Sequence, residues 1–126
     1  MNKELLIIFY RNPELGKVKT RLAASIGDEK ALAIYLKLSA HTRDVTENLT
    51  MDKALYYSDF ADREDNWSLT HFKKEIQTGR DLGERMRNAF AAGFEQGYQK
   101  IVIIGTDCFE LTPEIIKQSF ERLDHH

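Results

Sequence analysis

One apolar run near the end of the chain most constrains the fold. Residues 101–104 are Ile-Val-Ile-Ile, and the run ends at Gly105-Thr106-Asp107. Four consecutive β-branched residues without alternation predict a central strand covered on both faces, and such strands belong mostly to parallel α/β sheets. Open α/β sheets bind ligands at the carboxyl ends of their strands. Asp107 is therefore a candidate metal or substrate ligand, although a residue that caps the following helix would suit the same position.

Length and composition describe one ordinary globular domain. The chain has 126 residues, of which 42% are hydrophobic and 30% charged. Its formal net charge of -2 argues against a nucleic-acid-binding protein, which usually has a strong basic excess. The single cysteine, Cys108, excludes an internal disulfide and fits a cytoplasmic protein. No apolar run is long enough to predict a membrane span.

Hydrophobic periodicity predicts alternating strands and helices. Strands are expected over residues 5–10, 53–57, 72–77 and 100–105, and helices over 18–27, 29–49, 82–96 and from 112 onward. Asp81 with Glu84 has the form of a capping box, and Thr112-Pro113 is typical of a helix start. This alternation predicts a mostly parallel sheet with helices on both faces.

The segment after the first strand is rich in cations. Lys17, Lys19 and Arg21 stand within five residues, directly after Gly16. Cationic side chains and free backbone N–H groups beside a flexible glycine suit the phosphates of a nucleotide. The alternative is a solvated basic face on a short helix. The segment lacks the Walker A pattern, and no Gly-x-Gly-x-x-Gly motif follows the strand, so neither of those nucleotide folds is expected.

A second candidate segment precedes the predicted helix over residues 82–96. Gly79 permits a tight turn, and the amide of Gln77 offers a donor and an acceptor, which suits the edge of a nucleobase. Arg80 and Arg85 are candidates for phosphate contacts. The alternative is a plain helix cap with surface arginines.

The third segment is Thr106 to Glu110, which contains Asp107. A carboxylate ligand there favours Mg²⁺ or Mn²⁺, which would bridge the phosphates of a bound nucleotide. Cys108 is interpreted as a small buried residue rather than a nucleophile, because no histidine stands beside it in the sequence.

Together, the three segments resemble a family of bacterial glycosyltransferase-like proteins of the selenodomain-associated transferase type, which have the nucleotide-diphospho-sugar transferase (GT-A) fold. The matching motifs are Phe9 to Pro13 with Gly16 to Leu22, then Gln77 to Met86, and finally Ile104 to Thr112. The resemblance implies a Rossmann-like sheet in which the Gly16 segment lies against the phosphates. It also implies that Gln77 and Gly79 lie toward the base and that Asp107 lies near the metal.

The same resemblance implies a transferase. We expect metal-assisted transfer from a nucleotide sugar to an unknown acceptor, with Lys17, Lys19 and Arg21 offsetting charge on the leaving phosphate. No general base is assigned. A guanylyltransferase-like nucleotidyl transfer from a nucleoside triphosphate and a non-catalytic nucleotide-binding module stay open as alternatives.

Family members are longer than this chain. Residues 1–126 are therefore expected to form a single nucleotide-binding α/β domain, the N-terminal part of a longer fold that is incomplete at its carboxyl end. A sheet that ends early exposes an unpaired edge and apolar surface, so we also expect a homodimer or an aggregation-prone monomer.

Overall fold

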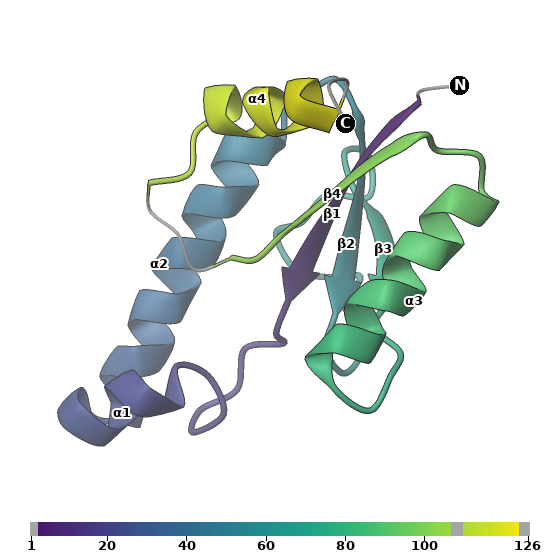
Figure 1. Cartoon of the computed structure of the whole chain (residues 1–126). Coiled ribbons are helices and arrows are strands. Elements are labelled where there is room, and N and C mark those ends of the chain that lie inside the picture. The colour runs from purple at the N-terminus through teal and green to yellow at the C-terminus, as the bar shows by residue number, and fades with distance from the viewer. Residues whose placement is uncertain (1–2, 107–109, 124–126) are drawn as a thin grey trace.

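The computed structural model describes residues 3–106 and 110–123 as a parallel sheet with helices on both faces (Figure 1). The strands are β1 (Glu4–Tyr10), β2 (Asp52–Tyr57), β3 (Lys73–Ile76) and β4 (Lys100–Ile104). The helices are α1 (Thr20–Ile26), α2 (Asp28–Thr46), α3 (Leu82–Glu95) and α4 (Pro113–Leu123). The strand order is β3-β2-β1-β4, and every pairing is parallel. The predicted α/β class and parallel sheet are confirmed.

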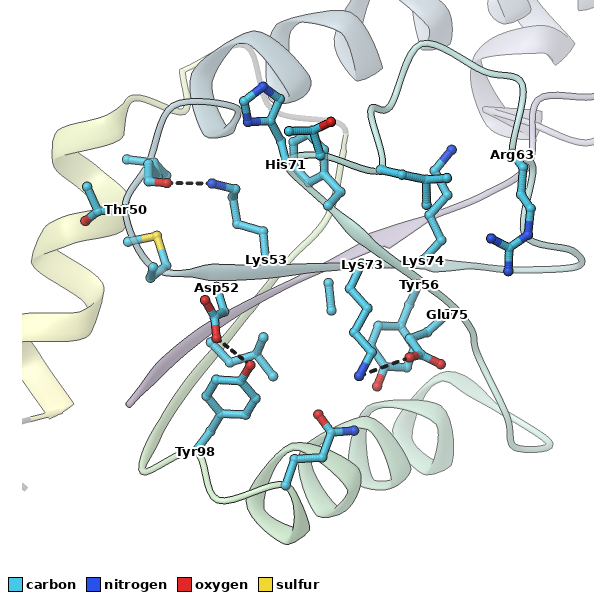
Figure 2. A pocket seen from close by; sticks show the side chains of 18 residues that line it. Thr50, Asp52, Lys53, Tyr56, Arg63, His71, Lys73, Lys74, Glu75 and Tyr98 are labelled. Carbon is cyan, nitrogen blue, oxygen red and sulfur yellow. Dashed lines mark hydrogen bonds and ion pairs between the residues drawn. The ribbon is translucent and has the colours of Figure 1, made fainter. Parts of the chain in front are cut away.

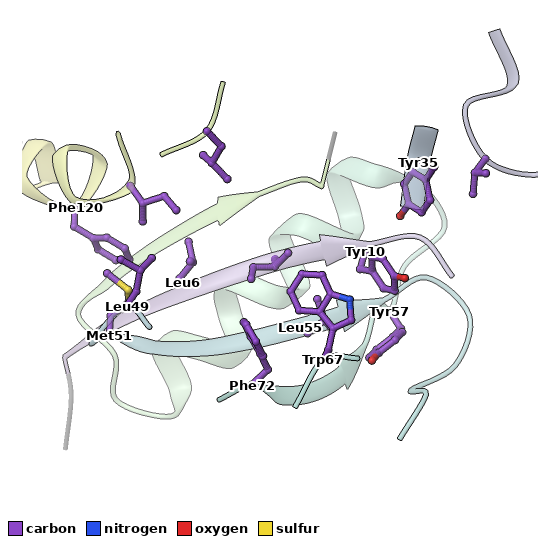
Figure 3. Packing of buried hydrophobic residues seen from close by; sticks show 14 residues of the cluster. Leu6, Tyr10, Tyr35, Leu49, Met51, Leu55, Tyr57, Trp67, Phe72 and Phe120 are labelled. Atoms are coloured by element: carbon purple, nitrogen blue, oxygen red, sulfur yellow. The ribbon is translucent and has the colours of Figure 1, made fainter. Parts of the chain in front are cut away.

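The core lies on both faces of β1 and β2, whose side chains are mostly apolar on either side. On one face the sheet packs against α2, α4 and the loop before β3, with buried residues Leu6, Ile8, Tyr10, Tyr35, Leu55, Tyr57, Trp67, Phe72, Ile116 and Phe120 (Figure 3). On the other face it packs against α3, with buried residues Leu5, Ile7, Ala54, Tyr56, Ala89 and Ile101. In α3, a Cβ on Gly93 would lie 2.6 Å from Cδ1 of Ile101, so glycine permits this close approach of helix and sheet.

The expectation that residues 101–104 form a central strand is wrong within the part of the chain that the structure describes. There, β4 lies at one edge of the sheet and pairs with β1, while Val102, Ile103 and Ile104 are only partly buried. The run is apolar because both faces of β4 pack against helices: α3 contacts one face and α4 contacts the other. A homodimer through this edge stays a prediction.

Two helix starts, those of α3 and α4, carry the capping residues that the sequence predicts. The Asp81 carboxylate accepts a hydrogen bond from the Glu84 N–H at 2.8 Å, and the Glu84 carboxylate accepts one from Nε of Arg80 at 3.3 Å. The Thr112 hydroxyl accepts one from the Ile115 N–H at 3.2 Å.

Among the described residues, no helix combines the length and the apolar character needed to cross a membrane.

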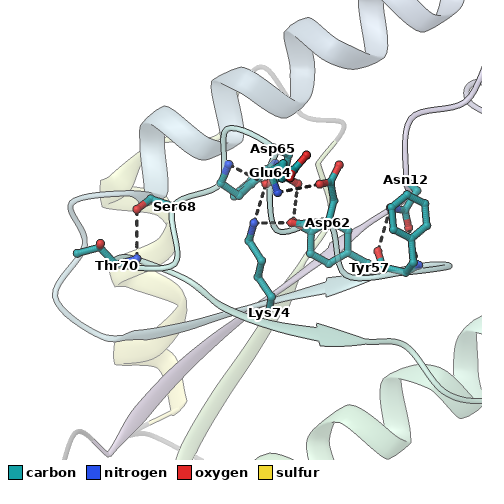
Figure 4. Close-up of polar contacts among 10 residues, drawn as sticks. Asn12, Tyr57, Asp62, Glu64, Asp65, Ser68, Thr70 and Lys74 are labelled. Carbon is teal, nitrogen blue, oxygen red and sulfur yellow. Dashed lines mark hydrogen bonds and ion pairs between the residues drawn. The ribbon is translucent and has the colours of Figure 1, made fainter.

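The long connection between β2 and β3 is fixed by a buried lysine (Figure 4). The Lys74 side chain is 1% exposed, and its Nζ lies 2.7 Å from Oδ1 of Asp65 and donates to the Asp62 carbonyl at 2.5 Å. The Tyr57 hydroxyl donates to the other Asp65 oxygen. This network holds the connection over the sheet, and Trp67, which belongs to the connection, is 2% exposed and packs in the core.

Candidate functional site

A cleft of about 630 Å³ lies at the carboxyl ends of the strands. Every strand exit contributes to its lining, with Arg11 after β1, Ser58 after β2, Gln77 after β3 and Gly105 after β4. The start of α3 and Lys19, which precedes α1, complete this lining. Residues from all three segments singled out in the sequence therefore meet in one cleft, because the carboxyl ends of parallel strands share one edge of the sheet.

Among the described residues that line the cleft, cations outnumber carboxylates. The cations are Arg11, Lys19, Arg80 and Arg85, and the carboxylates are Asp59 and Asp81. Asp81 already accepts a backbone N–H at the start of α3. This charge balance favours an anionic ligand.

Side-chain hydrogen bonds fix the conformation of the segment before α3. The Gln77 amide donates from Nε2 to the Tyr56 carbonyl at 2.9 Å, and its Oε1 accepts from Nη1 of Arg85 at 3.3 Å. Arg85 also donates from Nε to the Gly79 carbonyl at 3.1 Å. Gly79 has a φ of +141°, and a Cβ there would lie 2.8 Å from the Arg85 backbone nitrogen. Only glycine allows this turn to pack so closely on α3.

The basic segment after β1 supplies one cleft residue. Lys19 lines the cleft, and its backbone is left-handed with a φ of 50°. The Lys17 side chain is 69% exposed and lies 3.8 Å from Glu14. Arg21 is exposed on α1, and neither it nor Gly16 lines the cleft. The alternative of a solvated basic face therefore describes Lys17 and Arg21, whereas Lys19 is placed to meet a ligand.

The predicted metal ligand, Asp107, and its neighbour Cys108 lie outside the described residues. Thr106, which precedes them in the sequence, lines the cleft. Over residues 3–106 and 110–123, no group of three or more His, Cys, Asp or Glu side chains could hold a metal ion. A metal ion in this cleft would therefore depend on Asp107 and on oxygens of the ligand itself.

Two buried polar side chains that the sequence did not single out tie the strand exits together. The Tyr35 hydroxyl accepts from the Arg11 N–H at 2.9 Å and from Oγ1 of Thr106 at 3.3 Å, and it donates to the Arg11 carbonyl at 2.7 Å. Oδ1 of Asn12 accepts from the Asp59 N–H at 2.9 Å. Burial raises the pKa of Tyr35, so its hydroxyl keeps its proton. On the sequence alone, Tyr35 fits the apolar face of α2 and gives no sign of this polar role.

Replacing Tyr35 with phenylalanine is expected to loosen the exits of β1 and β4. The variant leaves the Arg11 N–H and carbonyl without this partner, so the free energy of unfolding should fall by about 1–3 kcal/mol. Urea unfolding measures this loss, and hydrogen exchange should show faster exchange of the Arg11 amide. Tyr98→Phe, which loses one bond to Asp52 at the other end of the sheet, serves as control. Unchanged Arg11 exchange in Tyr35→Phe would contradict the prediction.

A second cleft, of about 690 Å³, lies toward the amino ends of β2 and β3 (Figure 2). Its polar groups are largely engaged with one another. The Tyr98 hydroxyl donates to Asp52 at 2.6 Å, and Nζ of Lys53 donates to the Leu49 carbonyl at 2.5 Å. Burial lowers the pKa of Lys53. Because ligands of open α/β sheets bind at the carboxyl ends of the strands, the cleft at that end is the stronger candidate.

Comparison with known proteins gives one family and one informative structure. The model of the DUF2064 family, described as an uncharacterized protein conserved in bacteria, matches residues 40–126. The crystal structure of a "putative nucleotide-diphospho-sugar transferase" from Desulfovibrio desulfuricans G20 has a TM-score of 0.87 and 29% sequence identity to the chain. None of the curated proteins matches this chain.

The match to the solved structure covers 99% of this chain and 56% of the other. This chain therefore spans about half the length of that protein. The predicted nucleotide-diphospho-sugar transferase fold is confirmed, whereas the narrower selenodomain-associated type stays a prediction.

Proposed function

Because this chain belongs to the DUF2064 family of proteins conserved in bacteria and has a nucleotide-diphospho-sugar transferase fold, we propose that it binds a nucleotide sugar and acts in glycosyl transfer. The observation that carries the proposal is the gathering of Arg11, Lys19, Arg80 and Arg85 around one cleft at the carboxyl ends of the strands. The diphosphate of the donor is the anion that these side chains would bind. The acceptor is unassigned.

Catalysis in this proposal comes mainly from position and charge. Lys19 and Arg85, which approach the cleft from different segments, offset the negative charge that develops on the leaving diphosphate. The hydrogen bonds from Arg85 to Gln77 and to the Gly79 carbonyl hold its guanidinium in place before the ligand binds. The side chain therefore loses less conformational entropy on binding. Arg80 is more mobile in this scheme, because its side chain is 91% exposed and pairs with Glu84.

We propose that Asp107 holds Mg²⁺ or Mn²⁺ together with phosphate oxygens of the donor. A divalent ion would supply further charge compensation for the diphosphate. The support is the sequence position of Asp107, directly after Thr106 in the lining of the cleft.

Removal of single cleft cations is expected to weaken binding of a nucleotide sugar. Lys19→Ala and Arg85→Ala should each raise the Kd by about tenfold or more, because each loses a charge-assisted hydrogen bond to phosphate. Isothermal titration calorimetry with uridine- and guanosine-diphosphate sugars in the presence of Mn²⁺ measures the change. Lys17→Ala is the matched control, because Lys17 stands two residues from Lys19 but outside the cleft lining. Its Kd should stay within about twofold of the wild type.

Four outcomes bear on the proposal in different ways. Equal losses in Lys17→Ala and Lys19→Ala would show that general basicity, rather than this cleft, attracts the ligand. Binding that requires Mn²⁺ and is lost in Asp107→Ala supports the metal-assisted transferase, whereas binding that is indifferent to metal supports a nucleotide-binding module. Tighter binding of nucleoside triphosphates than of nucleotide sugars would favour nucleotidyl transfer.

A further inference from the structure

The oxygen and the nitrogen of the Gln77 amide each have a hydrogen-bond partner inside the protein. Its side chain lines the cleft, but the residue is only 9% exposed. Nε2 donates to the Tyr56 carbonyl, and Oε1 accepts from Arg85. These partners fix the orientation of the amide, because a carbonyl cannot donate and a guanidinium cannot accept. The two groups that suited the edge of a nucleobase therefore each already hold a partner within the protein, and the amide is held in one orientation.

The Arg85 guanidinium is held from two sides. Nη1 donates to Gln77 and Nε donates to the Gly79 carbonyl, so two of its five N–H donors are used within the loop. The other donors belong to a side chain that lines the cleft. A guanidinium that is fixed in this way loses less side-chain freedom when it binds an anion than a free one does.

The spacing of the segment follows from this arrangement. Gly79 must be glycine because its Cβ would lie 2.8 Å from the Arg85 backbone nitrogen, and its carbonyl then faces the Arg85 side chain. Gln77 stands at the exit of β3, where its own N–H donates to the Tyr57 carbonyl at 2.8 Å. The strand thus fixes Gln77, and Gln77 fixes Arg85.

We propose that Gln77 is a positioning residue that orients Arg85 toward the phosphates of the ligand and makes no contact with the base. The inference rests on the proposed function, because it assigns Arg85 to the diphosphate. It replaces the base-contact role that the sequence predicts for Gln77. The predicted phosphate role of Arg85 is kept and given its mechanism.

A double-mutant cycle between Gln77 and Arg85 tests the proposal. Calorimetry is done with inorganic pyrophosphate and with uridine, guanosine, adenosine and cytidine diphosphates, on the wild type, Gln77→Leu, Arg85→Ala and the double variant. Gln77→Leu should weaken binding of pyrophosphate and of all four nucleotides by the same factor, about tenfold. In the Arg85→Ala background, Gln77→Leu should have no further effect, because the residue that it positions is gone.

A base contact makes the opposite prediction. Gln77→Leu would then leave pyrophosphate binding unchanged, alter the ranking of the four nucleotides, and cost as much with Arg85→Ala as without it. Any of these results would overturn the proposal. Asn88→Ala is the matched control, because Asn88 donates to the Thr78 carbonyl at 2.8 Å in the same loop but does not line the cleft. It should leave all five affinities unchanged.

A measurement without ligand separates this inference from the proposed function. Nuclear magnetic resonance of the Arg85 Nε–H group should show an ordered side chain in the wild type, in Asn88→Ala and in Gln77→Glu, which keeps an acceptor for Arg85. The side chain should become mobile in Gln77→Leu. An equally ordered Arg85 in Gln77→Leu would overturn the inference even if no nucleotide binds. Failure of the wild type to bind any phosphate ligand, with Arg85 ordered by Gln77, would instead count against the proposed function.

Discussion

Replacing Lys74 with methionine is expected to lower the free energy of unfolding by about 3–5 kcal/mol. The Lys74 side chain is 1% exposed and that of Asp65 17%, with 2.7 Å between Nζ and Oδ1. Methionine has a similar length but leaves the Asp65 carboxylate without its cation in a largely dry environment. Lys74 also donates to the Asp62 carbonyl, so the substitution removes a second hydrogen bond in the same loop. Urea unfolding followed by circular dichroism measures the loss.

Lys73→Met is the matched control for Lys74→Met. Lys73 is the neighbouring residue on β3, but its side chain is 60% exposed and lies 3.5 Å from Glu75. An exposed ion pair contributes little, so its removal should change the free energy of unfolding by less than about 1 kcal/mol. Comparable losses in the two variants would mean that Lys74 stabilises the fold through its alkyl chain and not through Asp65. Adding Asp65→Leu to Lys74→Met should recover part of the stability, because the unpaired charge is then absent.

Raising the pH above 10 is expected to destabilise the fold steeply. Burial raises the pKa of every tyrosine in the chain, Tyr10, Tyr35, Tyr56, Tyr57 and Tyr98, the last of them to about 12. The raised tyrosine pKa values stabilise the folded chain fully below the pKa of about 10 that tyrosine has in the unfolded chain. This stabilisation is lost as the pH rises toward the pKa values of the folded chain, because the unfolded chain ionises first. Each tyrosine contributes up to about 1.4 kcal/mol per pH unit in that range.

Absorbance at 295 nm and circular dichroism, recorded together from pH 9 to 12.5, test this expectation. Tyrosinate should appear in one cooperative step that coincides with unfolding. Lys53 acts in the opposite direction, because burial lowers its pKa and the folded chain releases that proton first, but it is a single group. Tyr98→Phe should make the decline in stability with pH shallower. Gradual tyrosine ionisation near pH 10 in a chain that is still folded would contradict the prediction.

The sequence was sufficient for the architecture. Apolar runs such as those over residues 5–10 and 101–104, the helical period of α3 and the caps at Asp81 and Thr112 depend on interactions within a few residues. These local patterns also located three segments that contribute to the lining of the cleft, but not Ser58 and Asp59 at the exit of β2. The position of β4 was the exception. The side-chain pattern indicates which faces of a strand are covered. It does not indicate which strands lie next to each other, because neighbouring strands pair through backbone hydrogen bonds.

By itself, the sequence determined the order of strands and helices and the parallel sheet, and it predicted the edge at which a ligand would bind. Only the tertiary structure decided which residues of each segment lie at that edge of the sheet. Lys19 faces the cleft while Lys17 does not, Gln77 holds Arg85, and Tyr35 joins the exits of β1 and β4. The physical reason is that such roles depend on contacts between residues far apart in the chain, which only folding brings within hydrogen-bonding distance.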